Sequence, residues 1–192
     1  VVAAVRAGLW KEKLEEALPR VSELPFDSDR KRMTTVHKIE FPEKLPKALK
    51  ELIQSPAFHA HEPFLSVTKG SVDGLIEISN RVWTEKEIVA LDHDWENRIL
   101  KAHDDLAQKG MRILGVAFRQ CSGEALKPEC ENLESELVFV GMFAMIDPAR
   151  SEVKDAVATA KSAGIRPIMI TGDHPLTALY IAKELGIATN ED

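Results

Sequence analysis

The residues best suited to chemistry lie near the end of the chain, in a turn that follows an apolar segment. Thr171, Gly172 and Asp173 form this turn. Pro175 follows, at a position where a helix accepts proline in its first turn. A hydroxyl, backbone N–H groups and a helix N-terminus at the carboxyl end of a parallel strand could together bind phosphate. An ordinary loop in which Asp173 or His174 caps the helix explains the spacing equally well.

Three residues elsewhere have side chains suited to a nucleotide, although the glycine-rich signatures GxxxxGK[ST] and GxGxxG are absent from the sequence. Phe26 offers an aromatic face on which adenine could stack. Lys69, followed by Gly70, offers a charged head on an apolar stem. Arg112 has a planar guanidinium that can grip phosphate oxygens in pairs. A core phenylalanine and two solvated charges are the structural alternatives for these residues.

The elements that must position these residues change in character along the chain. Apolar periodicity and turn residues predict helices over 2–18, 45–54, 72–80, 94–109, 151–163 and 175–185, and strands over 21–24, 33–39, 64–68, 112–118, 137–146 and 168–170. Gly110 ends the fourth helix in the position that glycine favours. The first part is a mixed α+β pattern, whereas the end alternates strand and helix as parallel sheets do. We therefore expect two domains, 1–146 and 147–192.

The composition excludes several classes of protein. The chain has 192 residues, 44% of them hydrophobic, and a net charge of −6, which argues against nucleic-acid binding. The basic cluster Arg30-Lys31-Arg32 is typical of a solvated turn. Two cysteines do not make a disulfide framework, which favours a reduced cytosolic protein. The longest apolar run, 137–146, is about half of the roughly 20 residues that a membrane-spanning helix needs.

Five segments, in this order, resemble motifs of the P-type cation-transporting ATPases. They are a strand-turn-strand with an adenine-stacking phenylalanine, a KGA-like motif, an arginine segment before a strand, a DPPR-like junction and a TGD segment: Phe26 to Met33, Lys69-Gly70-Ser71, Gly110 to Leu114, Asp147-Pro148-Ala149-Arg150 and Thr171-Gly172-Asp173. Each is weak alone, but together they cover nearly the whole chain. The pattern is most similar to the type II, calcium-pump-like branch.

The resemblance implies a fold and a set of roles. It implies an α+β nucleotide-binding domain, with an antiparallel sheet flanked by helices, joined to a partial α/β Rossmann-like phosphorylation domain of the HAD type. ATP would be bound by residues of both parts: Phe26, Lys69, Gly70, Arg112, Asp147 and Arg150. Asp147 would also help to hold the hinge. Thr171, Gly172 and Asp173 would face the transferred phosphoryl group and its Mg²⁺.

The same resemblance implies partners and a location. The partners would be ATP and the remaining actuator, phosphorylation and transmembrane domains of a pump at the cytoplasmic face of a membrane, with no nucleic acid and no direct membrane contact by this part. The DKTGT motif that supplies the phosphorylated aspartate is absent, as are the GDPTE-like and GDGxND segments. We therefore expect an excised piece that does not turn over ATP alone. Calcium is the favoured ion, ahead of Na⁺, K⁺ and Mg²⁺.

Two other functions and a metal site stay open. A soluble phosphatase of the HAD superfamily would need an Asp-x-Asp nucleophile at a strand end, whereas Asp27-Ser28-Asp29 lies in a turn and Asp92-His93-Asp94 opens a helix. A nucleotide-free interaction module of the same fold is the second alternative. His59 and His61 are two residues apart, so both could face a metal if the segment were a strand. Prolines bracket the segment, which favours a surface loop, and we expect no metal site there.

Overall fold

The computed structural model describes residues 2–54, 58, 62–84, 87–123, 133–146, 149–172 and 175–188. Its internal contacts divide the chain into two compact units. Unit 1 comprises residues 1–93 and 115–141, and unit 2 comprises residues 94–114 and 142–192. The functional division near residue 146 stays a prediction.

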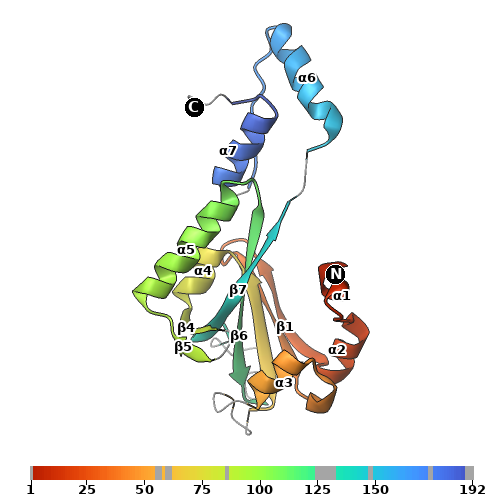
Figure 1. Ribbon diagram of the computed structural model, residues 1–192, viewed down its shortest axis with the longest axis vertical. Helices are drawn as coiled ribbons and strands as arrows, with labels where there is room; N and C mark the ends of the chain where they lie inside the picture. Colours follow the sequence, from red (N-terminus) through yellow and green to blue (C-terminus); the bar gives the residue numbers. More distant parts are fainter. Residues whose placement is uncertain are drawn as a thin grey trace. The chain divides into compact units, whose positions relative to one another are not determined.

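A seven-stranded sheet, in the order β1-β2-β3-β6-β7-β4-β5, dominates the fold (Figure 1). Its strands are β1 (Arg20–Asp27), β2 (Arg32–Lys38), β3 (Phe64–Gly70), β4 (Ser79–Trp83), β5 (Ile88–Ala90), β6 (Arg112–Cys121) and β7 (Leu137–Met145). The pairs β1–β2, β2–β3, β3–β6 and β4–β5 are antiparallel, and β4 pairs with β7 in parallel. The predicted α+β class with a mainly antiparallel sheet is confirmed for this part of the chain.

Among its described residues, unit 1 has four short α-helices and a 3-10 turn: α1 (Val2–Arg6), α2 (Lys11–Ala17), η1 (Pro42–Lys44), α3 (Lys47–Ile53) and α4 (Val72–Glu77). The single helix predicted over 2–18 is wrong. Gly8 adopts a left-handed φ of 75°, and its N–H bonds back to the Val5 carbonyl, which closes α1 before α2 begins. The helix predicted over 72–80 ends early, and its last residues begin strand β4, which the sequence pattern did not predict.

The two faces of the sheet in unit 1 carry different clusters, because successive side chains of a strand point to opposite faces. On one face, Leu65 and Phe118 pack with Leu52 of α3, and we call this the α3 face. On the other, Val36 and Cys121 pack with Leu133, and we call this the Leu133 face. Cross-strand partners share a face, so the register of the strands assigns every neighbouring residue to one of these two sides.

In the described part of unit 2 lie the longer helices α5 (His93–Ala107, from Asp94 onward), α6 (Ser151–Ser162) and α7 (Pro175–Glu184). Gly110 follows α5 with a left-handed φ of 71°, so the predicted glycine end of this helix is confirmed. A side chain at Gly110 would place its Cβ 2.1 Å from Cδ1 of Tyr180 in α7. The Thr177 hydroxyl of α7 donates a hydrogen bond of 3.0 Å to the Met111 carbonyl. The close approach of α7 to this loop therefore requires glycine.

The buried strand predicted over 168–170 is wrong. The segment forms no strand, and Ile170 is 94% exposed. β7 is likewise buried only in its first part, and Phe143, Met145 and the following Ile146 are exposed. A strand forms where neighbouring strands satisfy its backbone groups, and no described residues pair with segment 168–170. The parallel sheet of the predicted phosphorylation domain is therefore not seen in the described residues.

Among the described helices, none combines the length and the apolar character needed to cross a membrane.

Candidate functional site

The predicted adenine-stacking residue, Phe26, lies at the end of β1, next to a tightly bonded turn. The Asp27 carboxylate accepts hydrogen bonds of 2.9 Å from the backbone N–H groups of Asp29 and Arg30. These two bonds, that from Arg30 first, lower the pKa of Asp27 below its ordinary value and keep the carboxylate charged. The N–H of Lys31 bonds to the Asp27 carbonyl at 2.7 Å, and Lys31 itself takes a left-handed φ of 51°. The turn therefore holds the backbone beside Phe26 in one conformation, while its ring stays 64% exposed.

Lys69 and Gly70 end strand β3 beside this turn. Met33 pairs with Lys69 in the sheet, and Arg32 pairs with Gly70. A Cβ on Gly70 would lie 2.5 Å from Arg32 Cβ and 2.6 Å from the Lys31 carbonyl oxygen. That carbonyl also accepts a hydrogen bond from the N–H after Gly70, at 3.1 Å. Glycine therefore lets β3 approach the hairpin closely enough to hold Lys69 beside it.

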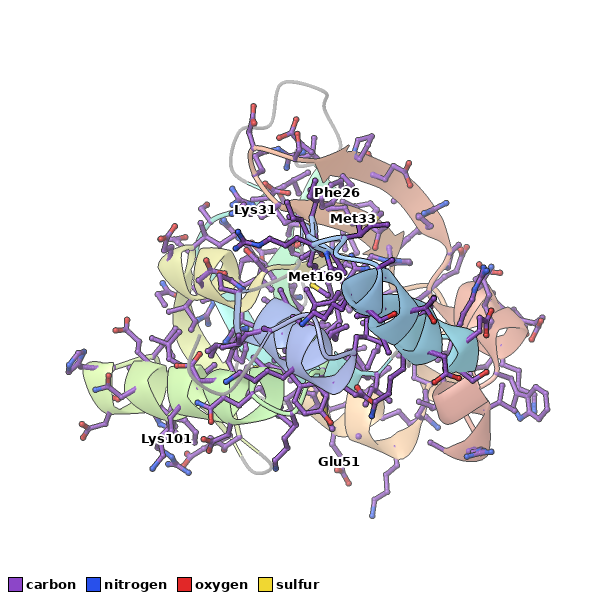
Figure 2. The ribbon with its side chains drawn as sticks, turned by 90° about the horizontal axis from the view of Figure 1, so that it is seen from above. Phe26, Lys31, Met33, Glu51, Lys101 and Met169 are labelled. Atoms are coloured by element: carbon purple, nitrogen blue, oxygen red, sulfur yellow. The ribbon has the colours of Figure 1, made fainter. Side chains whose placement is uncertain are left out.

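The register places Phe26, Met33 and Lys69 on the same side of the sheet. Lys69 is four residues after Leu65 in β3, so both side chains point to the α3 face. Met33 is the cross-strand partner of Lys69 and shares that face. The register of β1 shifts by one residue between Leu24, which pairs with Thr34, and Asp27, which pairs with Arg32, so Pro25 and Phe26 together lie opposite Met33. Both flanking pairs lie on the Leu133 face, which leaves Phe26 on the α3 face with Met33. The pairing of Asp27 with Arg32 brings Phe26 next to Met33 in the hairpin, and Figure 2 labels both residues together with Lys31 at the hairpin tip. An exposed ring, a thioether and an ammonium group on one surface fit the apolar base and the charged groups of a nucleotide.

The other predicted site residues belong to unit 2 where they are described. Arg112 is the first residue of β6 and is exposed. Arg150 is exposed at the start of α6, and Thr171 and Gly172 are also exposed. Asp147 and Asp173 lie outside the described residues, as do His59 and His61. The assembly of Arg112, Asp147 and Arg150 with Phe26 and Lys69 into one site stays a prediction. A Mg²⁺ site beside Thr171, Gly172 and Asp173 also stays a prediction. The described residues hold no cluster of three His, Cys, Asp or Glu side chains that could bind a metal.

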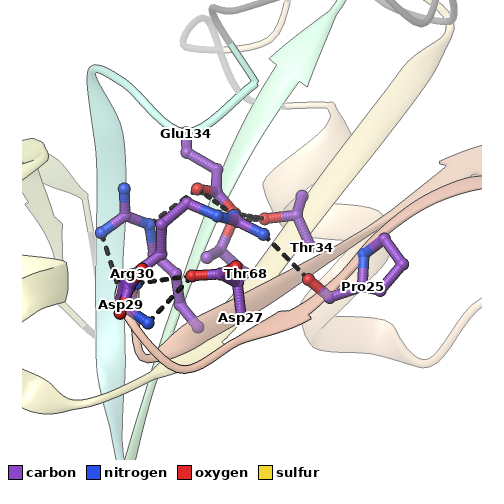
Figure 3. A network of polar contacts seen from close by, with 8 residues as sticks. Pro25, Asp27, Asp29, Arg30, Thr34, Thr68 and Glu134 are labelled. Atoms are coloured by element: carbon purple, nitrogen blue, oxygen red, sulfur yellow. Dashed lines mark hydrogen bonds and ion pairs between the residues drawn. The ribbon is translucent and has the colours of Figure 1, made fainter.

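Glu134 is a residue of this region that the sequence pattern did not single out. Its side chain is 7% exposed and accepts hydrogen bonds from two arginines and a threonine on the Leu133 face (Figure 3). Arg30 Nη1 lies 2.6 Å from both carboxylate oxygens, Arg32 Nε lies 2.7 Å from one, and Thr34 Oγ1 lies 2.9 Å from the other. Since Thr34 gives its only proton to Glu134, the 2.9 Å bond between Thr34 and Thr68 is donated by Thr68.

The electrostatics of this cluster keep Glu134 ionised. Burial acts to raise the pKa of Glu134, but the hydrogen bonds from Arg30, Arg32 and Thr34 outweigh it and lower the pKa below its ordinary value. The interpretation of Arg30-Lys31-Arg32 as a solvated turn is therefore wrong for its two arginines, which are 29% and 18% exposed and paired with Glu134. Two arginines at the start of a strand suggest that an acidic side chain elsewhere in the chain pairs with them. Nothing in the sequence selects Glu134 for this role over the other acidic residues of its segment.

A cavity of about 200 Å³ lies elsewhere in unit 1. Aromatic and charged side chains line it, among them Phe58, Arg81, Phe118, Arg119 and Glu136. It is smaller than the roughly 300–1,000 Å³ of typical small-molecule sites and contains none of the predicted nucleotide residues. It therefore does not compete with the surface around Phe26 as a nucleotide site.

Known proteins establish the family. A profile described as "P-type ATPase, cytoplasmic domain N" matches residues 1–152. Because the match covers more than half of the chain, the chain belongs to the family of P-type ATPase cytoplasmic N domains. The predicted resemblance to P-type ATPases is confirmed.

Similar proteins are cation pumps of several kinds. The chain is 38% identical over 188 residues to "Calcium-transporting ATPase 1" of Bacillus cereus, covering 98% of the chain and 19% of that protein. It is 32% identical over 187 residues to "Calcium-transporting ATPase 1" of Lactococcus lactis, covering 97% of the chain and again 19% of the relative. It is 34% identical over 182 residues to the "Sodium/potassium-transporting ATPase subunit alpha-1" of Oreochromis mossambicus, and this alignment covers 91% of the chain and 16% of that protein. The chain thus spans about a fifth of the length of the relatives it matches.

Proposed function

We propose that this chain is the ATP-binding region of a P-type cation-transporting ATPase, and that adenine stacks on Phe26. The observation that supports the proposal most directly is the exposed Phe26 ring, held on a fixed hairpin and on the same sheet face as Lys69. Membership of the N-domain family supports it independently. When bound, ATP supplies the phosphoryl group that such pumps transfer to an aspartate.

The chain's own residues would then divide the work of binding. Phe26 contacts the face of the base, and Lys69 lies at the rim of the base pocket, where its ammonium group balances negative charge. Gly70 lets the two strands approach closely enough to bring these groups together. Arg112 grips phosphate oxygens through its guanidinium fork, and Arg150 binds near the ribose and the phosphates. Asp147 orders the hinge beside Arg150.

The remainder of the proposal concerns the parent pump. Residues 147–192 would begin the phosphorylation domain, in which Thr171, Gly172 and Asp173 face the phosphoryl group and its Mg²⁺. The exposed apolar residues of this segment, Ile165, Ile168 and Ile170, would pack against the rest of that domain. Further partners would be the actuator and transmembrane domains, with this region at the cytoplasmic face. Without a DKTGT aspartate the chain itself would bind ATP and not hydrolyse it.

Calcium is the ion that we propose for the parent pump. Two bacterial relatives whose names specify calcium align over 98% and 97% of the chain, at 38% and 32% identity. Two sodium/potassium pumps align over 91% and 92% of the chain at 34% and 33% identity, so the preference for calcium is small. Cation selectivity requires transmembrane residues, and transport assays of the full-length pump with each cation would test the assignment.

The test of nucleotide binding is a titration of the 192-residue chain with ATP and with AMP, followed by backbone amide shifts. Wild type should show saturable shifts around Phe26 and Lys69, and Phe26→Ala and Lys69→Glu should each weaken binding about tenfold or more. Phe41→Ala and Lys38→Glu are the matched controls, since Phe41 is an exposed phenylalanine outside the hairpin and Lys38 lies at the opposite end of β2. No saturable shift in wild type at millimolar nucleotide would refute the proposal and favour a nucleotide-free interaction module.

A further inference from the structure

Glu134 is linked to the backbone beside Phe26 through Arg30. The Arg30 guanidinium donates from Nη1 to the Glu134 carboxylate and from Nη2 to the Pro25 carbonyl oxygen, at 2.9 Å (Figure 3). Pro25 immediately precedes Phe26, so this carbonyl belongs to the peptide unit that carries the ring. The guanidinium is planar and rigid, and fixing one edge of it on Glu134 fixes the other edge against the backbone.

The direction of this link sets it apart from ordinary packing. Leu133 is anchored between Val36 and Cys121, which holds the start of the 133–136 turn against the sheet and presents Glu134 to the hairpin. Glu134 lies on the Leu133 face, whereas Phe26 points to the α3 face, so the carboxylate does not touch the surface where a base would stack. An effect of Glu134 on a stacked base is therefore indirect, and Arg30 is the partner of Glu134 that also bonds to the Pro25 carbonyl beside Phe26.

We propose that Glu134 is a positioning residue for the adenine site, which acts by holding Arg30 against the Pro25 carbonyl and so fixing the Phe26 ring in its stacking orientation. The inference rests on the proposed nucleotide binding at Phe26. It adds to that site a residue more than 100 positions away in the sequence, contributed by the turn before β7. Arg30 is the second positioning residue in this link.

Two variants of the full 192-residue chain separate positioning from folding. Glu134→Gln keeps the size of the side chain and removes its charge. Arg30→Lys keeps the charge pair with Glu134 but removes the second donor, which reaches the Pro25 carbonyl. Each should weaken ATP binding about three- to tenfold, and adenosine and AMP should weaken by the same factor, because the disturbed contact is with the base that all three share. Arg20→Lys, in an exposed ion pair of the same strand, is the control and should bind as wild type.

A double-mutant cycle with Phe26→Ala provides the decisive readout. If Glu134 acts through the ring, then Glu134→Gln should lower affinity in wild type and have no further effect on affinity in the Phe26→Ala background. Its effect on urea stability should remain in both backgrounds, which distinguishes positioning from general destabilisation. Arg30→Lys takes the place of Glu134→Gln in the cycle if the latter does not fold.

The possible failures are distinguishable. If Phe26→Ala weakens adenosine binding but neither Glu134→Gln nor Arg30→Lys does, the positioning role is wrong and the proposed function stands. An equal loss in the Phe26→Ala background would also overturn the positioning role. If wild type binds no nucleotide, or if Phe26→Ala binds as tightly as wild type, the proposed site fails and this inference fails with it.

Discussion

Replacing Glu134 by alanine should destabilise the fold far more than its place in an acidic, polar segment suggests. The substitution removes the carboxylate that accepts from Arg30, Arg32 and Thr34 and leaves both guanidinium groups beside a partly closed space. Removing one partner of a buried ion pair typically costs about 3–5 kcal/mol. Because Arg30 and Arg32 remain 29% and 18% exposed, water can recover part of this, and we expect a loss of about 2–4 kcal/mol.

Urea unfolding of wild type and Glu134→Ala measures this loss. With a slope of about 2 kcal/mol per molar urea, the transition midpoint should fall by about 1–2 M. Glu23→Ala is the matched control, since Glu23 pairs with Arg20 at 2.8 Å but both side chains are well exposed. That change should cost about 0–1 kcal/mol. If Glu134→Ala changes the stability no more than Glu23→Ala does, the reasoning from the buried ion cluster is refuted.

Three further predictions concern acid stability and two glycines. The pKa of Glu134 is lowered by folding, so the stability it contributes is complete above the unfolded pKa and is lost as the pH falls through the folded pKa; urea curves below about pH 4.5 should show a steeper loss for wild type than for Glu134→Gln. Gly70→Ala should cost about 1–3 kcal/mol and weaken ATP binding, because its Cβ would lie 2.6 Å from the Lys31 carbonyl; urea unfolding and an ATP titration measure the two effects. Gly110→Ala should lower the melting temperature, because φ is 71° and the Cβ would lie 2.1 Å from Tyr180.

Each of these predictions has a control or a contrary outcome. Parallel acid limbs for wild type and Glu134→Gln would contradict a folded Glu134 that is ionised by its partners. Gly123→Ala is the control for Gly70→Ala. Its Cβ would make only an ordinary contact at 3.6 Å, so the stability should be nearly unchanged. Gly164→Ala has a similar φ of 78° but open space around it, so its cost should be smaller than that of Gly110→Ala; equal costs would show that the approach of α7 is unimportant.

The sequence predicts elements well where the local signal and the tertiary environment agree. The strands around the charged turn after Phe26 form as predicted, because the turn's own Asp27 carboxylate and backbone bonds close it. The helix ending at Gly110 forms because an amphipathic run meets a residue that tolerates a left-handed φ. Both signals are contained within a few neighbouring residues, so no distant partner has to be known.

The errors arise where distant partners decide the outcome. Ser79 and Asn80 end the predicted helix over 72–80, but pairing with β7 and β5 makes Ser79 to Trp83 strand β4. Segment 168–170 has the apolar character of a buried strand but no paired neighbour among the described residues. For the candidate site, resemblance supplied Phe26 and Lys69 and the structure placed them on one sheet face. Glu134 was missed because its partners are 100 or more residues away, and an acidic side chain in a polar segment gives no local sign of burial.

The central claim is that adenine stacks on Phe26, and intermolecular nuclear Overhauser effects between ATP and the labelled chain test it most directly. The claim predicts contacts from the adenine H2 and H8 protons to the Phe26 ring and the Met33 methyl group, both lost in Phe26→Ala. Contacts that fall instead on Phe58 and Phe118, which line the cavity elsewhere in unit 1, would contradict the assignment of the site. Saturating ATP without any contact to Phe26 would contradict it equally.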